Sequence, residues 1–223
     1  MAYKTRLLQC QQPTTWHWEM GWPNAPTIAA VQPSYLKDSF TLKHNIHLLH
    51  LPSCALLLTS DAKSMYTCIP TEPTLDLSSS YLHTNENNTL HNYNSSALIK
   101  ALQIIVQNNP VQFGNTYWQQ ILGTGKGISP APPQATIFYG LHEQQFLPER
   151  SQHVIYYKQF IDGIFRIWLP HSNPIKNNEL WELFKHRMQS WHGLEWEFTQ
   201  PSSTCNFMDL TISISNSEIT TTI

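Results

Sequence analysis

Two aspartates stand where a carboxylate could take part in chemistry. Asp61 follows the apolar run 55–60, and Asp162 lies in the middle of the apolar and aromatic run 154–168. A strand end and a hairpin tip can be neighbours in an antiparallel sheet, and two carboxylates placed there repel each other unless a divalent cation lies between them. Oxygen-rich sites of this kind select Mg²⁺, and two metal ions about 3.5–4 Å apart can stabilise both the attacking and the leaving oxygen of a phosphoryl transfer. From spacing alone the plainer interpretation is favoured, in which Asp61 is a strand cap and Asp162-Gly163 is a simple turn.

An α+β arrangement is expected to position these two residues. The run 55–60 has the composition of a strand, and Asp162-Gly163 between two β-prone runs predicts a hairpin over 154–168. Residues 1–35 and 123–133 are rich in proline or glycine and are predicted to be irregular. Helices are predicted over 36–52, 72–84, 95–108, 135–146 and 176–191, and two further strands over 194–199 and 206–214. This order predicts an antiparallel sheet with helices packed on one face.

Composition sets limits on the kind of protein. The chain has 223 residues, of which 41% are hydrophobic and 12% aromatic, so it can bury a sizeable core. Only 13% are charged and the formal net charge is -2, which counts against tight nucleic-acid binding by this chain alone. Four tryptophans lie in apolar periodic segments and are predicted to pack in the core rather than to stack on bases: Trp168, Trp181, Trp191 and Trp196.

The cysteines indicate a reducing compartment. The four are far apart in the sequence, and none forms a Cys-x-x-Cys pair. The first residues lack the apolar run of a secretory signal, and the run 55–58 is far too short to span a bilayer. We therefore expect an intracellular protein, nuclear or cytoplasmic, that is neither secreted nor membrane-embedded.

Four segments, in this order, resemble the motifs of reverse transcriptases. Residues 61–69 resemble the first motif, an aspartate followed five residues later by an aromatic, here Tyr66. Residues 123–127 and the following 130–135 resemble the second motif, a glycine-rich turn that leads into a helix. Phe160-Ile161-Asp162-Gly163 resembles the third motif, Tyr-x-Asp-Asp, and 206–212 resembles the Phe-Leu-Asp-Leu strand that follows the palm helix. From about Gln32 onward the chain is similar to reverse transcriptases of non-LTR or Penelope-like retroelements.

This resemblance implies a fold and a function. The fold would be the α+β palm of polymerases, with partial fingers and no thumb. Residues 1–35 would be a degenerate remnant of the fingers, and residues 36–223 the reverse transcriptase fingers and palm. The function would be RNA-directed DNA polymerase, acting on an RNA template, a DNA primer and deoxynucleotides with two Mg²⁺ or Mn²⁺ ions.

The resemblance also assigns roles to individual residues. Asp61 and Asp162 would hold the metal ions. The ring of Tyr66 would occupy the space that a ribonucleotide 2′-hydroxyl needs. The backbone of five consecutive residues would line the triphosphate: Ala62, Lys63, Ser64, Met65 and Tyr66. Gln120 and Lys126 would touch template or phosphate, and Gly127 would allow a close approach to primer or nucleotide.

Departures from the family pattern indicate an impaired enzyme. Gly163 stands where the family has the second aspartate of the third motif. Lys126 stands where an apolar residue is usual, Ile128 where threonine is usual, and Gln134 where an aromatic is usual. The sequence ends at Ile223, where the family continues into the thumb. A truncated copy is expected to be inactive or nearly so, and the alternative is a non-enzymatic retroelement remnant, inert or weakly nucleic-acid binding.

Overall fold

A computed structural model describes residues 7–10, 32–85, 94–125, 128, 130–148 and 152–223. The chain forms two compact units, each built from two separate stretches. The first unit comprises residues 1–32 and 64–139, and the second comprises 33–63 and 140–223. Most of the predicted fingers remnant, residues 1–35, lies outside the described residues, so its boundary stays a prediction.

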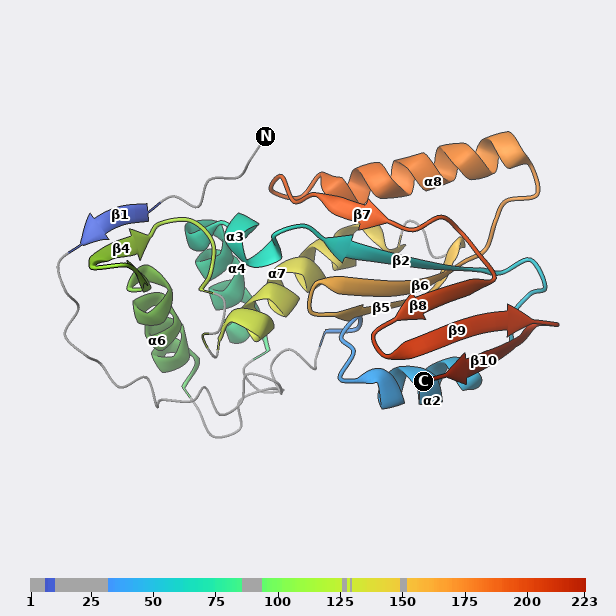
Figure 1. The fold of residues 1–223 in the computed structure, drawn as a ribbon, viewed down its shortest axis with the longest axis horizontal. Coiled ribbons are helices and arrows are strands. Elements are labelled where there is room, and N and C mark those ends of the chain that lie inside the picture. Colours follow the sequence, from blue (N-terminus) through green and yellow to red (C-terminus); the bar gives the residue numbers. More distant parts are fainter. Residues whose placement is uncertain (1–6, 11–31, 86–93, 126–127, 129, 149–151) are drawn as a thin grey trace. The chain divides into compact units, whose positions relative to one another are not determined.

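A four-stranded antiparallel sheet organises the second unit (Figure 1). Its strand order is β5 (Val154–Phe160), β6 (Gly163–Trp168), β2 (Leu56–Ala62) and β7 (Trp196–Phe198). Strand β2 is central, and its register places Leu57 opposite Ile167 and Asp61 opposite Gly163. The predicted strand and the predicted hairpin are therefore both present and lie side by side.

Two helices cover one face of this sheet, as the sequence predicts. Helix α8 (Pro174–Gln189) begins with Asn173, whose side-chain oxygen accepts hydrogen bonds from the first-turn backbone, with proline at the first helical position. Its apolar side chains recur at helical spacing, and the ring of Trp181 packs 5.5 Å from that of Trp168 on β6. The C-terminal part of α7 (Ala131–Phe146) lies on the same face, where Phe146 packs against Phe184.

A second sheet and a short helix cover part of the other face. The core here joins Leu42 and Ile46 of α2 (Ser39–His47) to Leu57 and Phe165. The sheet has the order β10 (Glu218–Thr222), β9 (Leu210–Ser215) and β8 (Thr204–Phe207). The single strand predicted over 206–214 is wrong, because the chain reverses at Met208, whose φ of 54° breaks the extended backbone, and β8 pairs back on β9.

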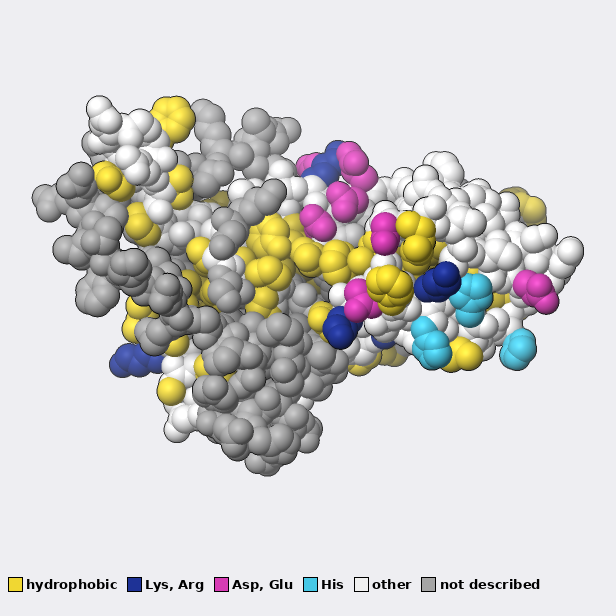
Figure 2. All heavy atoms as spheres, turned by 60° about the horizontal axis from the view of Figure 1, so that its bottom comes forward, with side chains coloured by type: hydrophobic (Ala, Val, Ile, Leu, Met, Phe, Trp, Pro, Cys, Tyr) yellow, Lys and Arg dark blue, Asp and Glu magenta, His cyan; other side chains and the backbone are white. Residues whose placement is uncertain are grey.

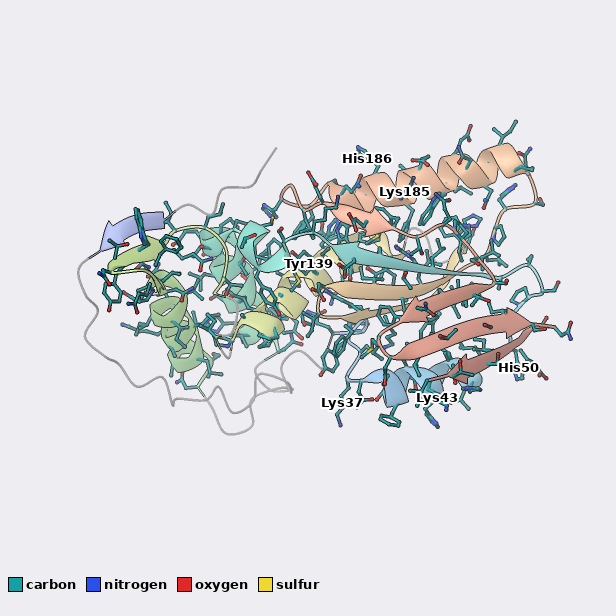
Figure 3. The ribbon with its side chains drawn as sticks, in the orientation of Figure 1. Lys37, Lys43, His50, Tyr139, Lys185 and His186 are labelled. Carbon is teal, nitrogen blue, oxygen red and sulfur yellow. The ribbon has the colours of Figure 1, made fainter. Side chains whose placement is uncertain are left out.

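The outer surface near α2 carries cations without forming a uniformly basic face. Lys43 on this helix, and Lys37 and His50 just before and after it, lie at the surface and point outward (Figure 3). On the face drawn in Figure 2, lysine and histidine side chains are interspersed with acidic ones. This mixture agrees with the low net charge of the sequence.

Helices and a small hairpin form the first unit. Helix α4 (Thr71–Thr84) packs on α6 (Ser95–Gln107) through Leu75, Leu102 and Val106, and α3 (Met65–Cys68) precedes them. A three-stranded sheet has the order β1 (Leu7–Cys10), β4 (Thr116–Gln120) and β3 (Pro110–Phe113); its hairpin was not predicted. Within the described ranges, no helix is both long and apolar enough to cross a membrane.

Candidate active site

One pocket of the second unit brings the two predicted aspartates together. It has a volume of about 540 Å³ and lies where strand β2 ends and the β5–β6 hairpin turns. Asp61 and Asp162 both line it, together with Glu197 of β7 and with Phe207 and Met208 of the β8–β9 hairpin. Side chains from four separate segments therefore meet at one end of the sheet.

The burial pattern of β2 explains why Asp61 reaches solvent. Leu57 through Ser60 are buried, and Asp61 is the first exposed residue of the strand. Because Asp61 lies opposite Gly163 on one side and opposite Glu197 on the other, the Asp61 and Glu197 side chains point to the same face of the sheet.

A tight and strained turn positions Asp162. Phe160 pairs with Gly163, so the two turn residues are Ile161 and Asp162, one position earlier than the predicted Asp-Gly turn. Ile161 has a φ of 54°, which is costly for a β-branched residue. Two hydrogen bonds hold the turn: the Gln159 side-chain amide donates to the Ile161 carbonyl at 2.8 Å, and the Ala62 amide donates to the Asp162 carbonyl at 3.0 Å. The second bond ties the turn directly to β2.

Partial burial and neighbouring like charges raise the pKa of Asp61. Partial burial is the main cause, and the carboxylates of Asp162 and Glu197 add to it. Glu197 in turn forms an ion pair with Lys63, with 3.0 Å between Lys63 Nζ and Glu197 Oε1. The pocket is thus a place where negative charge accumulates and where a cation is favoured.

Sequence reasoning missed Glu197. Alternation in the predicted strand 194–199 buries Trp196 and leaves Glu195 and Glu197 outward, which was a usable signal. The alternation does not say which strand pairs with this one, and only the pairing register of β7 on β2 places Glu197 opposite Asp61.

Packing explains the glycine at position 163. A Cβ built on Gly163 would lie 3.1 Å from Cε2 of Phe207, tighter than side chains normally allow. The phenyl ring of Phe207 therefore occupies the space next to the backbone at Gly163, the position that the motif resemblance aligns with the second aspartate of the third reverse transcriptase motif. The glycine at position 163 and the packing of the β8–β9 hairpin therefore belong to the same local structure.

The first unit brings two predicted motif segments into contact. The Thr124 amide donates to the Tyr66 carbonyl at 2.7 Å, and a Cβ on Gly123 would lie 2.6 Å from that same carbonyl oxygen. Gly123 also has a φ of 86°. Both the close approach of the Tyr66 carbonyl and this left-handed backbone therefore require glycine at this position. The glycine-rich turn of the second motif thus packs on the helix that carries Tyr66, whose role as a steric gate stays a prediction.

The remaining predicted nucleotide-binding residues have diverse environments. Ala62 and Met65 are buried, the Ala62 amide already donates to the Asp162 carbonyl, and Ser64 has a left-handed φ of 51°. Gln120 is buried, its oxygen accepting from Asn109 and its nitrogen donating to the Leu122 carbonyl. These bonds indicate a structural role for Gln120, because both ends of its amide are used within the unit. Lys126 and Gly127 lie outside the described residues.

The donor set suits a hard divalent cation. Asp61 and Asp162 offer carboxylate oxygens at one pocket, the ligands that Mg²⁺ prefers, and Mg²⁺ usually completes its shell with water. Across the described ranges, no three His, Cys, Asp or Glu side chains are close enough to hold a metal together. Asp61 and Asp162 are thus the two residues that could hold an ion at this pocket, and the predicted pair of metal ions stays a prediction.

Known structures share this fold at low sequence identity. The chain matches an apo telomerase from Candida tropicalis truncated from its C-terminal domain (13% identity, TM-score 0.62, 87% of this chain and 43% of that one). It also matches telomerase from Candida albicans in complex with a TWJ fragment of telomeric RNA (12% identity, TM-score 0.65, 91% of this chain and 38% of that one). A third match is the BmCPV RNA-dependent RNA polymerase (11% identity, TM-score 0.57, 94% of this chain and 21% of that one).

The chain spans less than half the length of the solved structures it matches. No protein-family model and no curated protein matches the sequence. What the structural matches establish is the fold: an α+β polymerase-like palm.

Proposed function

We propose that this protein is a reverse transcriptase domain by descent, an RNA-directed DNA polymerase with an impaired active site. One observation carries the proposal: in a palm-like fold, Asp61 and Asp162 meet in one pocket, where the end of β2 lies beside the β5–β6 turn. A strand cap and an unrelated turn, the plainer interpretation of these residues, would not need to share a pocket. The motif order further favours a non-LTR or Penelope-like retroelement.

The chain's own residues would place the reactants. Asp61 and Asp162 would hold Mg²⁺ or Mn²⁺, which when bound supplies charge stabilisation for the phosphoryl transfer. The primer 3′-hydroxyl would attack the α-phosphate of a deoxynucleotide, and pyrophosphate would leave. The strained turn at Ile161 fixes the direction of Asp162, and the backbone bond from Ala62 keeps the two aspartates in one register. An RNA template and a DNA primer are the proposed partners, in keeping with the RNA fragment in the Candida albicans telomerase complex.

Impairment follows from the contents of the pocket. Phosphoryl transfer depends almost entirely on positioning and on charge stabilisation of the transition state. A missing carboxylate ligand therefore weakens metal binding and with it this charge stabilisation. Gly163 removes that ligand, and Phe207 occupies the neighbouring space.

Cation binding and primer extension together test the proposal. Mn²⁺ binding is measured by electron paramagnetic resonance in the wild type, Asp61→Asn and Asp162→Asn, with Asp209→Asn, an acidic residue outside the pocket lining, as the matched control. We expect one Mn²⁺ site that both pocket variants lose and Asp209→Asn retains. Primer extension on poly-rA with Mg²⁺ or Mn²⁺ is expected to be weak or absent. If both pocket variants still bind Mn²⁺ as the wild type does, the polymerase proposal is wrong. Robust primer extension by the wild type would overturn the proposal that the active site is impaired.

The alternative function is a non-enzymatic remnant that binds nucleic acid weakly. Gly163 and the net charge of -2 favour it, since a protein that neutralises many phosphates is normally basic. Fluorescence anisotropy with an RNA–DNA hybrid distinguishes the two: a remnant binds equally with and without Mg²⁺, whereas a polymerase site binds primer, template and deoxynucleotide more tightly when Mg²⁺ is present.

A further inference from the structure

The pocket that would receive a nucleotide is lined by carboxylates and by no basic side chain. Three of its lining residues are acidic and none is lysine or arginine. Arg166, the cation nearest along β6, is fully buried on the opposite face of the sheet beneath α8. A polyphosphate that entered this pocket would meet like charge unless metal ions or a neighbouring cation neutralised it.

Lys63 is a cation next to this pocket. It follows Asp61 by two positions, and its backbone amide donates to the Glu195 carbonyl at 2.9 Å, which continues the pairing of β2 toward β7. Its ammonium group contacts the Glu197 carboxylate at 3.0 Å. Both side chains are largely solvent-exposed, at 49% for Lys63 and 67% for Glu197. This cation beside the pocket is therefore bound to one of the pocket's own acids.

We propose that Glu197 restrains polyphosphate binding by holding Lys63, and that Lys63 exchanges Glu197 for the phosphates of the incoming nucleotide. This inference rests on the proposed function, which supplies the nucleotide. An exposed ion pair of this kind is weak, so it can be exchanged at little cost for a multiply charged phosphate chain. Lysine suits such an exchange because its ammonium group is a compact point charge on a flexible stem.

Glu197 acts through two physical effects. It occupies the Lys63 ammonium group, and it adds negative charge next to Asp61, to which it lies opposite in the strand register. Both effects oppose an anionic ligand. Removing the carboxylate while keeping the size of the side chain should therefore strengthen polyphosphate binding, and most of the gain should require Lys63.

Isothermal titration calorimetry with two probes tests this inference. Mg²⁺-loaded dATP and Mg²⁺-loaded inorganic tripolyphosphate are titrated into the wild type, Glu197→Gln, Lys63→Gln and the double variant. The matched control is Glu182→Gln, which breaks an ion pair of 2.7 Å with Lys185 on α8, away from the pocket. Lys185 is labelled on this helix in Figure 3.

We expect Glu197→Gln to lower the dissociation constant roughly three- to tenfold for both probes, the size that loss of a competing surface ion pair and a like charge predicts. Lys63→Gln should raise the constant, and in the Lys63→Gln background the Glu197→Gln gain should shrink to about twofold or less. Glu182→Gln should change nothing. Glu197→Asp, which keeps the charge but shortens the reach to Lys63, should give a smaller gain and serves if Glu197→Gln fails to fold.

The outcomes separate this inference from the proposed function. Binding of dATP that is unchanged in both Glu197 variants overturns the inference and leaves the polymerase proposal standing. Tripolyphosphate binding that tightens in Glu197→Gln, without any Mn²⁺ site at Asp61 and Asp162, supports the inference and removes the polymerase proposal. If neither probe binds any variant, the inference is wrong.

Discussion

Asp61 and Glu143 are two carboxylates that belong to opposite faces of the same sheet, in opposite circumstances. Asp61 is exposed, lies in an open pocket and has acidic neighbours. Glu143 on α7 is only 3% exposed, and its Oε1 accepts a 2.7 Å hydrogen bond from the Tyr157 hydroxyl. Burial raises the pKa of both carboxyls, and that of Glu143 reaches about 7.

The neighbours of each carboxylate differ in sign. Around Asp61 the charges are like, which water and cations can neutralise. Near Glu143 the charge is opposite: Arg166 is fully buried, and its guanidinium carbon lies 4.9 Å from the ring centre of Phe184 and 5.3 Å from that of Phe198. A buried group has no solvent to stabilise it, so the protein must supply the opposing charge and the aromatic surroundings itself. Like charges are thus kept where a ligand can enter, and opposite charges where none can.

Among the predictions, substitution of the buried Arg166 should cause the largest loss of stability. Arg166→Met is expected to lower the free energy of unfolding by up to about 3 kcal/mol, because it removes the positive charge that acts on the Glu143 carboxyl and the guanidinium that packs over the Phe184 and Phe198 rings. Urea denaturation measures the loss. In the double variant Arg166→Met/Glu143→Gln the loss should be clearly smaller, since no charge remains unpaired; equal losses would mean that the two groups are not coupled.

Titration of Glu143 should show which protonation state the fold prefers. Its pKa is raised from 4.5 to about 7 on folding, so the protonated form favours the folded state. This stabilising contribution is full below pH 4.5 and is lost as the pH rises through about 7, at most about 3 kcal/mol. Unfolding free energies at pH 5 and pH 8 measure it, and Glu143→Gln should be distinctly less sensitive to this pH change. An unchanged pH dependence in that variant would assign the effect to another group.

Restoring the second aspartate of the third motif should cost stability without restoring activity. Gly163→Asp pushes a side chain against Phe207, and overpacking of this kind costs about 1–3 kcal/mol. Thermal unfolding should show a similar loss for Gly163→Ala, which adds only the clashing Cβ, and part of it should return when Phe207→Leu accompanies Gly163→Asp. Primer extension by Gly163→Asp alone is expected to stay at the wild-type level, and vigorous extension would show that one carboxylate was the main defect.

Neutralising Asp61 should have the smallest effect on stability, and it should stabilise the fold where the other substitutions destabilise it. Asp61→Asn removes a charge that Asp162 and Glu197 oppose, so the free energy of unfolding at neutral pH should rise by a few tenths of a kcal/mol. The same variant should lose the Mn²⁺ site. A loss of stability comparable to that of Arg166→Met would mean that Asp61 has a structural role, and the contrast between the two faces would disappear.

Local pattern was sufficient to predict most elements. The run before Asp61, the hairpin over 154–168 and the amphipathic helix after Asn173 each have a single consistent periodicity, and all three are present. Trp168, Trp181 and Trp196 are buried, as their apolar segments predicted, whereas Trp191 is only half-buried. The β8–β9 hairpin was missed because its turn residues, Met208 and Asp209, are not a common turn pair. The Gly114-Asn115 turn of β3–β4, by contrast, was a usable signal in the sequence.

By itself, the sequence determined the palm-like order of elements and the two aspartates, because hydrophobic periodicity and a catalytic residue type are properties of neighbouring positions. Only the tertiary structure decided what surrounds them. Glu197 faces Asp61 because of strand register, Phe207 fills the space beside Gly163 because a second sheet packs on the first, and Glu143 lies beside Arg166 because α7 covers the far face. These pairs join residues far apart in the chain, and nothing in the local pattern of either partner specifies the other.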